Sequence, residues 1–331
     1  MTNKILSHNE ISENPPVLID IGASAHLPED WRVIAPYSIC IAFDADNRDI
    51  DYIVNEEKKY KKLYTFNSIV VDSNEELTDF FLTKSPYCSS TLKPLNKQLE
   101  EWSFYKFFEI EKSVKIKSTN LQTVLNKLNV KQIDWFKTDS QGTDLMIFKS
   151  LGQDIYSNIL VADFEPGIID AYQNEDKLYH LLEFMDKSNF WISDINIGGN
   201  QKINKTIKEL FFNDMNEFQL QSILKYSPTC AEITYINNFK KNNLTKRDFL
   251  LGIVFSIIKN QLPFALELAY LGKQRFNESF FDEIKDYLLQ LIKNKLCTLN
   301  NSSQKSSINN KKDFIKDFIP PILLKFYRKT L

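Results

Sequence analysis

Glycine is scarce in this chain, and so are paired cysteines. Only 8 glycines occur among 331 residues, which excludes collagen-like and glycine-rich low-complexity proteins and makes each glycine in a turn informative. The four cysteines form no Cys-x-x-Cys pair. We therefore expect neither a structural zinc site nor a disulfide framework, predict no metal site, and favour a reducing cytoplasmic location.

The chain also lacks an excess of charge and a segment that could cross a membrane. Its net charge of −2 gives no reason to expect a nucleic-acid partner. The polar N-terminus has no apolar stretch of signal-peptide length, and the longest apolar run, residues 249–258, is broken by Gly252 and Ser256. Hydrophobic residues still make up 43% of the chain, enough for a large core in a cytoplasmic protein.

Short β-branched runs alternate with helical patterns up to about residue 239. Five runs predict buried central strands, at residues 17–21, 40–44, 68–72, 133–139 and 159–165. Residues 190–192 and 231–236 predict further strands at the edge, and residues 121–128 and 177–187 predict helices. Such alternation predicts an α/β fold with a mainly parallel sheet that helices cover on both faces.

The sequence changes character after about residue 239. Helical spacing of Leu, Ile and Phe is followed by a stretch rich in Asn, Ser and Lys, and then by an apolar and basic end. We predict an α/β domain at 1–239, a helical extension at 240–297, a flexible linker at 298–312 and a basic amphipathic tail at 313–331. The tail suits peripheral contact with the inner membrane face, or packing on the domain as a last helix.

A carboxylate lies at or near the end of each expected central strand. These residues are Asp20, Asp44, Asp72, Asp139 and Glu165. Ligands of open α/β sheets bind beyond the carboxyl ends of the strands. The row of acids therefore predicts either a polar ligand site or a set of helix N-caps.

The first expected strand leads into a loop with a single glycine, Gly22. The loop residues Gly22, Ala23 and Ser24 do not reproduce the three glycines with which a dinucleotide fold seats a pyrophosphate. The chain also contains no Gly-Lys-Ser/Thr of a P-loop. The loop therefore suits a ligand without phosphate groups.

The acids fit the parts of one such ligand. Asp44, with Asp46 close behind it, can accept two hydrogen bonds from ribose hydroxyls. Asp72 can accept a hydrogen bond from the amine of adenine, and Asp20 can pair with an ammonium group. Ammonium, ribose and adenine without phosphate describe S-adenosylmethionine.

Several motifs resemble the FkbM family of S-adenosylmethionine-dependent methyltransferases. They are residues 18–24 (LIDIGAS), 42–44 (AFD), 119–125 (TNLQTVL) and 136–144 (FKTDSQGTD). The resemblance covers roughly residues 17–195 and implies a Rossmann-like fold and O-methylation of a hydroxyl group on a sugar or polyketide, in many members within surface-glycan biosynthesis. The family usually has Glu where this chain has Gln141, so the resemblance assigns no base to that position.

Methyl transfer to a hydroxyl requires alignment of the reacting atoms and a base that removes the hydroxyl proton. Such a base raises the reaction rate by about 10²–10⁴-fold. Asp139 and Glu165 are the carboxylates expected beside the methyl group, and His26 is a third candidate. Lys137, two residues before Asp139, can position the substrate or hold the charge of Asp139. The alternative is that Asp139 caps a helix with Lys137 as its ion-pair partner.

Two further segments are candidates for contact with an acceptor sugar. Residues 84–90 form a polar loop that is either an acceptor contact or a hairpin turn. The aromatic residues from Trp102 to Phe108 are expected in the core, with stacking on a sugar ring as the alternative.

Two other functions stay open. A nicotinamide-dependent oxidoreductase would use a similar sheet, but the missing glycines and the absence of Tyr-x-x-x-Lys argue against it. A non-catalytic module with a decayed cofactor site is the second rival. We favour a cytoplasmic, S-adenosylmethionine-dependent O-methyltransferase with a carbohydrate or glycoconjugate acceptor.

Overall fold

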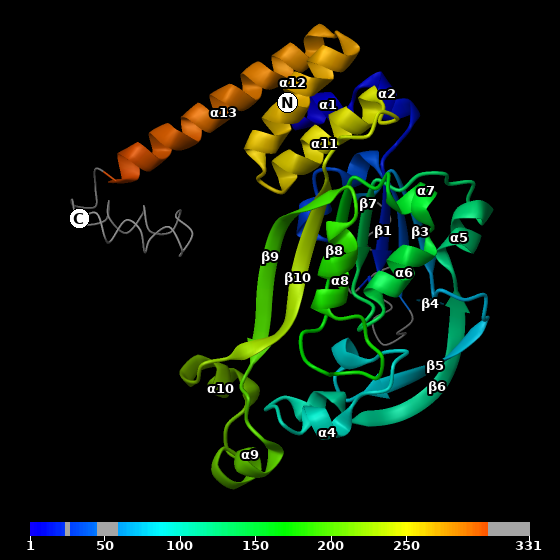
Figure 1. Cartoon of the computed structure of the whole chain (residues 1–331), viewed down its shortest axis with the longest axis vertical. Coiled ribbons are helices and arrows are strands. Elements are labelled where there is room, and N and C mark those ends of the chain that lie inside the picture. Colours follow the sequence, from blue (N-terminus) through cyan, green and yellow to red (C-terminus); the bar gives the residue numbers. More distant parts are fainter. Residues whose placement is uncertain (24–26, 45–58, 304–331) are drawn as a thin grey trace. The chain divides into compact units, whose positions relative to one another are not determined.

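The computed structural model describes residues 1–23, 27–44 and 59–303. The chain divides into two compact units, the first comprising Met1–Leu268 and the second beginning at Ala269. The first unit contains the sheet on which the predicted site depends (Figure 1).

A seven-stranded sheet forms the centre of the first unit, in the order β3-β2-β1-β7-β8-β10-β9. Its strands are β1 (Val17–Ile21), β2 (Ile39–Phe43), β3 (Lys62–Phe66), β7 (Trp135–Thr138), β8 (Val161–Phe164), β9 (Phe190–Asn200) and β10 (Ser227–Asn237). The first five strands in this order pair in parallel, and β10 is antiparallel to both of its neighbours. The predicted α/β, Rossmann-like fold is confirmed. Of the two strands predicted at the edge, β9 forms the edge and β10 lies inside it.

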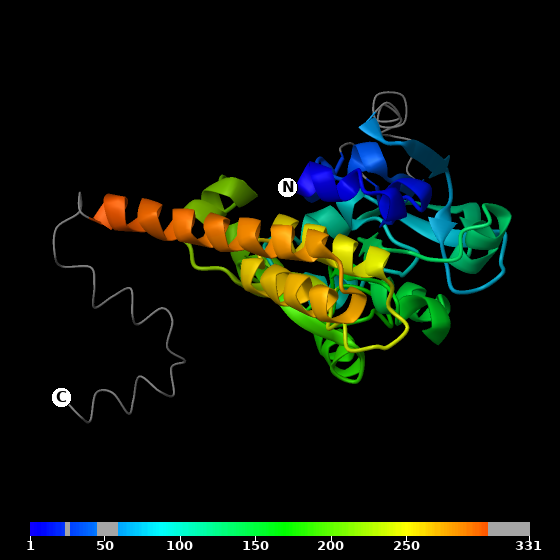
Figure 2. The same ribbon diagram turned by 90° about the horizontal axis from the view of Figure 1, so that it is seen from above.

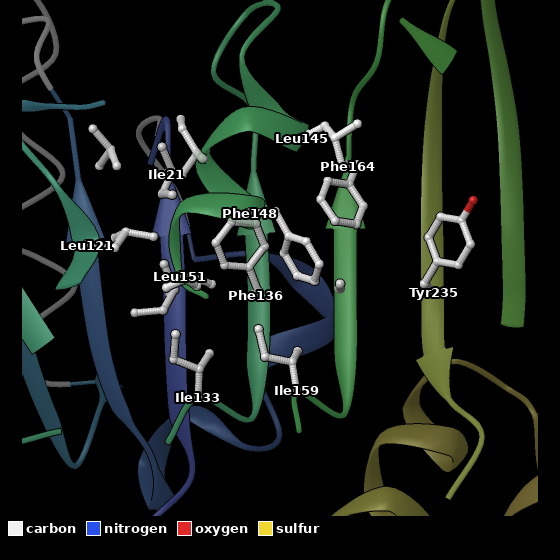
Figure 3. Packing of buried hydrophobic residues seen from close by; sticks show 14 of the residues in the cluster. Ile21, Leu121, Ile133, Phe136, Leu145, Phe148, Leu151, Ile159, Phe164 and Tyr235 are labelled. Carbon is white, nitrogen blue, oxygen red and sulfur yellow. The ribbon is translucent and has the colours of Figure 1, made fainter. Parts of the chain in front are cut away.

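Apolar side chains fill the space between one face of this sheet and three helices. The helices are α5 (Leu121–Lys127), α6 (Asp144–Ser150) and α8 (Leu178–Asp186). Figure 3 shows the centre of this core, where the Phe148 ring lies 5.3 Å from Phe136 and 5.1 Å from Phe164, measured between ring centroids. Burial of such large side chains is the main stabilising term for this face.

The opposite face packs against α11 (Lys246–Ile258) and the short helix η1 (Glu29–Trp31). Trp135 of β7 contacts Phe255 of α11 and Trp31 of η1, at centroid distances of 4.9 and 6.1 Å. Helices therefore cover both faces of the sheet, as the sequence predicts. The two faces differ because this one also carries charged side chains, which are described with the site.

Helix α11, the first helix of the predicted extension at 240–297, belongs to the first unit. Its residues from Arg247 to Ser256 are all buried, since the helix is apolar around most of its circumference. The N-terminal helices α1 (Thr2–Leu6) and α2 (Asn9–Glu13), blue in Figure 2, pack against it. The guanidinium of Arg247 makes two 2.8 Å hydrogen bonds to the carboxylate of Asp134, which ties α11 to the start of β7.

The chain continues with α12 (Leu262–Phe276) and α13 (Ser279–Ser303). Within the second unit, Phe276 stacks on Phe281 with ring centroids 5.9 Å apart. Helix α13 continues past residue 298, where the sequence predicts the linker to begin, because extending an existing helix adds one hydrogen bond for each residue fixed. The rest of that predicted linker and the whole predicted tail, residues 304–331, lie outside the described residues.

A second, three-stranded sheet has the order β4-β6-β5. It consists of β4 (Ile69–Val70), β5 (Leu77–Thr83) and β6 (Ile110–Thr119). The prediction of a central strand at residues 68–72 is therefore wrong, since that run forms the two-residue β4 and pairs with β6. The place beside β2 is taken by β3, whose polar Lys62 and Thr65 suit a half-exposed edge strand and give no apolar signal.

Candidate active site

The turn after β1 brings three strand ends together. Gly22 has a φ of +76°, and its backbone N–H and that of Ala23 both donate to the carbonyl of Phe43 at 3.1 Å. A Cβ atom at Gly22 would lie 2.3 Å from the carbonyl oxygen of Asp139. Only glycine allows both this backbone conformation and this approach of β1 to the residue that follows β7.

A first cavity of about 140 Å³ lies beyond the carboxyl ends of β1, β2 and β7. Residues 68–70, Phe80 and residues of the segment 86–91 complete its walls. Its described lining includes two carboxylates, Asp44 and Asp139, and no Lys, Arg or His. The polar loop predicted at residues 84–90 therefore supplies part of this cavity, through Pro86, Tyr87 and Ser89, and is not a tight hairpin turn.

A second cavity of about 270 Å³ adjoins the first, and Gln141 lines both. Its walls come from the end of β8, from the segment 167–175, from the β9–β10 pair and from the aromatic segment. Three carboxylates, Glu165, Glu175 and Glu232, belong to its described lining, which again includes no Lys, Arg or His.

The aromatic segment is partly core and partly cavity wall. Phe104, Tyr105 and Phe108 are buried in a cluster with Tyr172, as the sequence predicts. Phe104 and Phe108 also line the second cavity, and so does Phe107, which is 44% exposed. The segment therefore presents aromatic surface to any ligand of that cavity.

Gln141 forms the wall between the two cavities. It has a φ of +56°, unusual for a residue with a side chain, and is followed by Gly142 at +108°. Its side-chain amide donates to the carboxylate of Asp139, and the hydroxyl of Tyr172 donates to its Oε1 at 3.1 Å. Its backbone carbonyl accepts a 2.7 Å hydrogen bond from the Ser90 hydroxyl. The strained turn is therefore held from both sides.

Asp144, buried at the start of α6, fixes the two predicted catalytic carboxylates relative to each other. Its Oδ1 accepts hydrogen bonds from the Thr138 hydroxyl at 3.0 Å and from the Ser140 N–H at 2.9 Å, on either side of Asp139. Its Oδ2 accepts from the N–H of Glu165 at 2.9 Å. One side chain thus ties the end of β7 to the end of β8.

The pKa values of Asp139 and Glu165 are moved upward by different amounts. Burial is the main cause for both; it raises the pKa of Asp139 to about 6, against the lowering effect of Lys137. Burial and then the charge of Asp139 raise the pKa of Glu165 to about 8. At neutral pH Asp139 is therefore mainly ionised and Glu165 mainly protonated, which suits the first as a base.

Asp20 and Lys137 form a buried ion pair on the α11 side of the sheet. They face each other in register on β1 and β7, with Lys137 Nζ 3.5 Å from Asp20 Oδ1. Burial raises the pKa of Asp20; burial lowers that of Lys137, but the charges of Asp20, Asp139 and Glu165 outweigh this and raise it. Neither side chain is among the lining of the two cavities. Lys137 therefore acts on Asp139 through its charge, and its ion-pair partner is Asp20.

The row of charges continues across the sheet. Asp163 of β8 is in register with Lys137, accepts a 2.6 Å hydrogen bond from the Trp135 indole and pairs with Lys259 at 3.2 Å. Lys259 also pairs with Asp30 at 2.8 Å. Positive and negative side chains thus alternate over this face, so each buried charge has an opposite neighbour.

The remaining predicted site residues are not all brought together. Asp44 lines the first cavity, and Ala23 is buried beside Gly22. Asp72 is exposed and lines neither cavity, because it follows β4 and not a strand of the main sheet. Ser24, His26 and Asp46 lie outside the described residues.

Sequence reasoning missed Tyr172, Glu175 and Glu232 as wall residues and gave Asp144 no role. Asp144 ends the motif 136–144, but as an acid in the first turn of a helix it also fits an ordinary cap. No local pattern marks the others, because they reach the site from distant parts of the chain.

The sheet topology is Rossmann-like, and a family comparison indicates that the class is a methyltransferase. Residues 32–191 match the family model described as the methyltransferase FkbM domain. This match confirms the resemblance found in the sequence. Methyltransferases of this family generally use S-adenosylmethionine. No curated protein and no solved structure matches the chain.

Two negative findings apply to residues 1–23, 27–44 and 59–303. No helix there is both long and apolar enough to cross a bilayer. Nor do those residues place three or more His, Cys, Asp or Glu side chains where they could hold a metal ion.

Proposed function

We propose that this protein transfers a methyl group from S-adenosylmethionine to a hydroxyl group of a sugar, in the biosynthesis of a surface glycan or a related glycoconjugate. The observation that carries the proposal is the pair of adjoining cavities at the strand ends, with Gln141 in the wall between them. One cavity suits the cofactor and the other the acceptor, so that the reacting groups meet at the shared wall.

The first cavity fits S-adenosylmethionine better than a phosphorylated cofactor. Its described lining carries two carboxylates and no cation, which suits a cofactor with a sulfonium, an ammonium and a ribose. Asp44 follows β2, where a carboxylate can accept hydrogen bonds from both ribose hydroxyls. A nicotinamide dinucleotide carries a pyrophosphate, for which the described lining provides no positive partner.

The second cavity fits a sugar. Carboxylates and the amides of Gln141, Asn196 and Asn200 can accept from and donate to sugar hydroxyls. Phe107, which is 44% exposed, can cover the apolar C–H face of the ring. Glu165 follows β8 and lines this cavity, and its N–H donates to Asp144.

When bound, the cofactor supplies a methyl group on a positively charged sulfur. Asp139 would take the proton of the acceptor hydroxyl as its oxygen accepts the methyl group, and the sulfur would leave as a neutral thioether. Gln141 holds the Asp139 carboxylate through its amide, and Lys137 favours its ionised form. Alignment of the two bound partners supplies the largest share of the rate, about 7–11 kcal/mol for well-oriented reactants.

Calorimetric titration with S-adenosylhomocysteine tests the cofactor assignment, with NADH as the matched competitor from the rival function. We expect binding of S-adenosylhomocysteine with a Kd on the order of micromolar, about −8 kcal/mol, and no binding of NADH. The reverse result supports the oxidoreductase. Binding of neither supports a module without a working cofactor site. Transfer of labelled methyl groups to a panel of glycosides then tests the acceptor.

A further inference from the structure

We infer that the second cavity selects a sugar ring without a negative charge, an inference that rests on the proposed function of this cavity as the acceptor site. Acceptors with a carboxylate, phosphate or sulfate on that ring are disfavoured, whereas neutral rings and rings with an ammonium group are accepted. The argument uses the whole cavity wall: its charges, its hydrogen-bonding groups and its aromatic surface.

Three acidic side chains reach the cavity from separate elements, and one of them, Glu165, is mainly protonated at neutral pH. Glu165 follows β8, Glu175 precedes α8 and Glu232 lies on β10. Glu175 is buried and accepts a 2.7 Å hydrogen bond from the N–H of Ala171, which fixes its position at the wall. Glu232 is exposed, at the rim.

Cations near this region are committed to other partners. Lys137 lowers the pKa of Glu165 through its charge. Its ammonium lies on the α11 side of the sheet, 3.5 Å from Asp20 Oδ1. The ammonium of Lys177, near Glu175, is paired with Asp170 and donates to the carbonyl of Ile168 at 3.4 Å. Among the described residues, neither these nor other cations line the cavity.

The same wall is well suited to a neutral sugar. Hydroxyl groups both donate and accept, so carboxylates and amides such as those of Asn196 and Asn200 can satisfy them. An anionic group would lose its hydration and gain no opposite charge from the described wall, while lying close to carboxylates. An ammonium group would instead find carboxylate partners.

Matched pairs of methyl glycosides test the inference on the full chain with S-adenosylhomocysteine bound. The pairs are glucoside with glucuronide, galactoside with galacturonide, and N-acetylglucosaminide with its 6-phosphate. Binding is measured by saturation-transfer NMR and methylation by transfer from labelled S-adenosylmethionine. In each pair we expect the uncharged member to bind at least about tenfold more tightly, the ratio that a like-charge repulsion of 1.4 kcal/mol gives.

Reversal of one rim charge tests whether the wall causes the selectivity. Glu232→Lys should reduce the neutral-to-anionic ratio by at least about threefold at low ionic strength, where exposed charges are least screened. Glu13→Lys is the matched control, because Glu13 is exposed on α2, before the start of β1 and away from the strand ends that form the cavities.

The outcomes separate this inference from the proposed function. Preferential binding of the neutral members without methyl transfer would leave the cavity inference in place and contradict the proposed reaction. Equal or tighter binding of an anionic member would overturn the inference even if methylation occurs. The inference also fails if no glycoside binds, or if Glu232→Lys and Glu13→Lys change the ratio equally.

Discussion

The two cavities are built from different parts of the fold. The first is framed by strand ends of the parallel sheet, where backbone hydrogen bonds from Gly22 and Ala23 to Phe43 hold the chain in place. The second is framed by segments that come after the parallel strands, namely residues 167–175 and the antiparallel β9–β10 pair. Backbone hydrogen bonds between neighbouring strands therefore fix one side of the first cavity, whereas the walls of the second depend on pairings between distant segments.

Because the cavities are built from different segments, substitutions in the two regions should have different effects. Changes at the strand ends should alter cofactor affinity or the chemical step, since the backbone there fixes both. Changes in the outer wall should alter the choice of acceptor and leave the cofactor bound. The following four predictions test that division, beginning with the largest expected effect.

The largest expected effect is that of replacing Asp139, the proposed base after β7. Asp139→Asn keeps the shape of the side chain but cannot accept a proton at neutral pH, so kcat should fall by about 10²–10⁴-fold. The affinity for S-adenosylhomocysteine should stay close to that of the unmodified protein. Initial rates of methyl transfer and calorimetry check the two parts. Asp186→Asn, at an exposed residue of α8, is the matched control. If turnover is unaffected while Glu165→Gln abolishes it, the base is Glu165.

Gly22→Ala should distort the turn after β1, which lines the first cavity. The new Cβ would lie 2.3 Å from the Asp139 carbonyl oxygen at a φ of +76°. The free energy of unfolding should fall by about 1–3 kcal/mol, and cofactor affinity should fall with it. Gly152→Ala is the matched control, since Gly152 has a φ of +80° but its Cβ would meet nothing closer than 3.6 Å. Urea unfolding should show destabilisation of both variants. Calorimetry with S-adenosylhomocysteine should show loss of cofactor binding only for Gly22→Ala.

Asp44→Ala should weaken cofactor binding without a loss of fold. Hydrogen bonds to a charged group contribute about 1.5–3 kcal/mol each, so loss of the ribose contacts should lower affinity by at least about tenfold. Asp72→Ala provides the comparison, because Asp72 is an exposed acid that lines neither cavity. Calorimetry should show the loss for Asp44→Ala alone. Unchanged affinity in a folded Asp44→Ala variant would falsify the assignment.

Glu165→Gln tests the raised pKa of Glu165 through the pH dependence of the free energy of unfolding. The pKa of Glu165 rises from 4.5 to about 8 on folding, through burial and the charges of Asp139, Asp144 and Glu232, which Lys137 partly offsets. Between these values the folded state holds a proton that the unfolded state has lost, so the contribution of Glu165 to stability is present below pH 4.5 and is lost as the pH rises through 8. Glu165→Gln removes this loss.

The advantage of Glu165→Gln over the unmodified protein should therefore grow from about pH 5 to about pH 8.5. Urea unfolding at several pH values measures it, and Glu13→Gln, at an exposed residue that is not among the causes of the raised pKa, serves as the control. A difference between Glu165→Gln and the unmodified protein that stays constant over this range contradicts the raised pKa.

The comparison of the cavities also explains what the sequence could predict. Buried parallel strands have continuous apolar runs, so β1, β2, β7 and β8 are visible without a structure. Since parallel strands end at one edge, the positions of Asp44, Asp139 and Glu165 followed from these runs. Strand alternation places Asp20 on the face opposite to Ile19 and Ile21, where it pairs with Lys137 and lines neither cavity.

The outer elements gave weaker signals. β3 and β6 contain many polar residues because they are half exposed, and the apolar residues 68–72 misled the prediction of the third strand. Glu232 and Tyr172 reach the second cavity through pairings that no local pattern reveals. The left-handed turn at Gln141 is stabilised by Ser90 and Tyr172, which lie far from it in the sequence.

The hydrogen bonds of Asp144 have a consequence for how this enzyme can diverge. They join the residues around Asp139 to the backbone of Glu165 inside the sheet, without help from the segments that form the outer wall. Substitutions at exposed positions of the β9–β10 pair, such as Glu232, can therefore leave the spacing of Asp139 and Glu165 unchanged. Under the proposed function, the choice of acceptor could then change at such exposed positions while Asp144 keeps the two strand ends together.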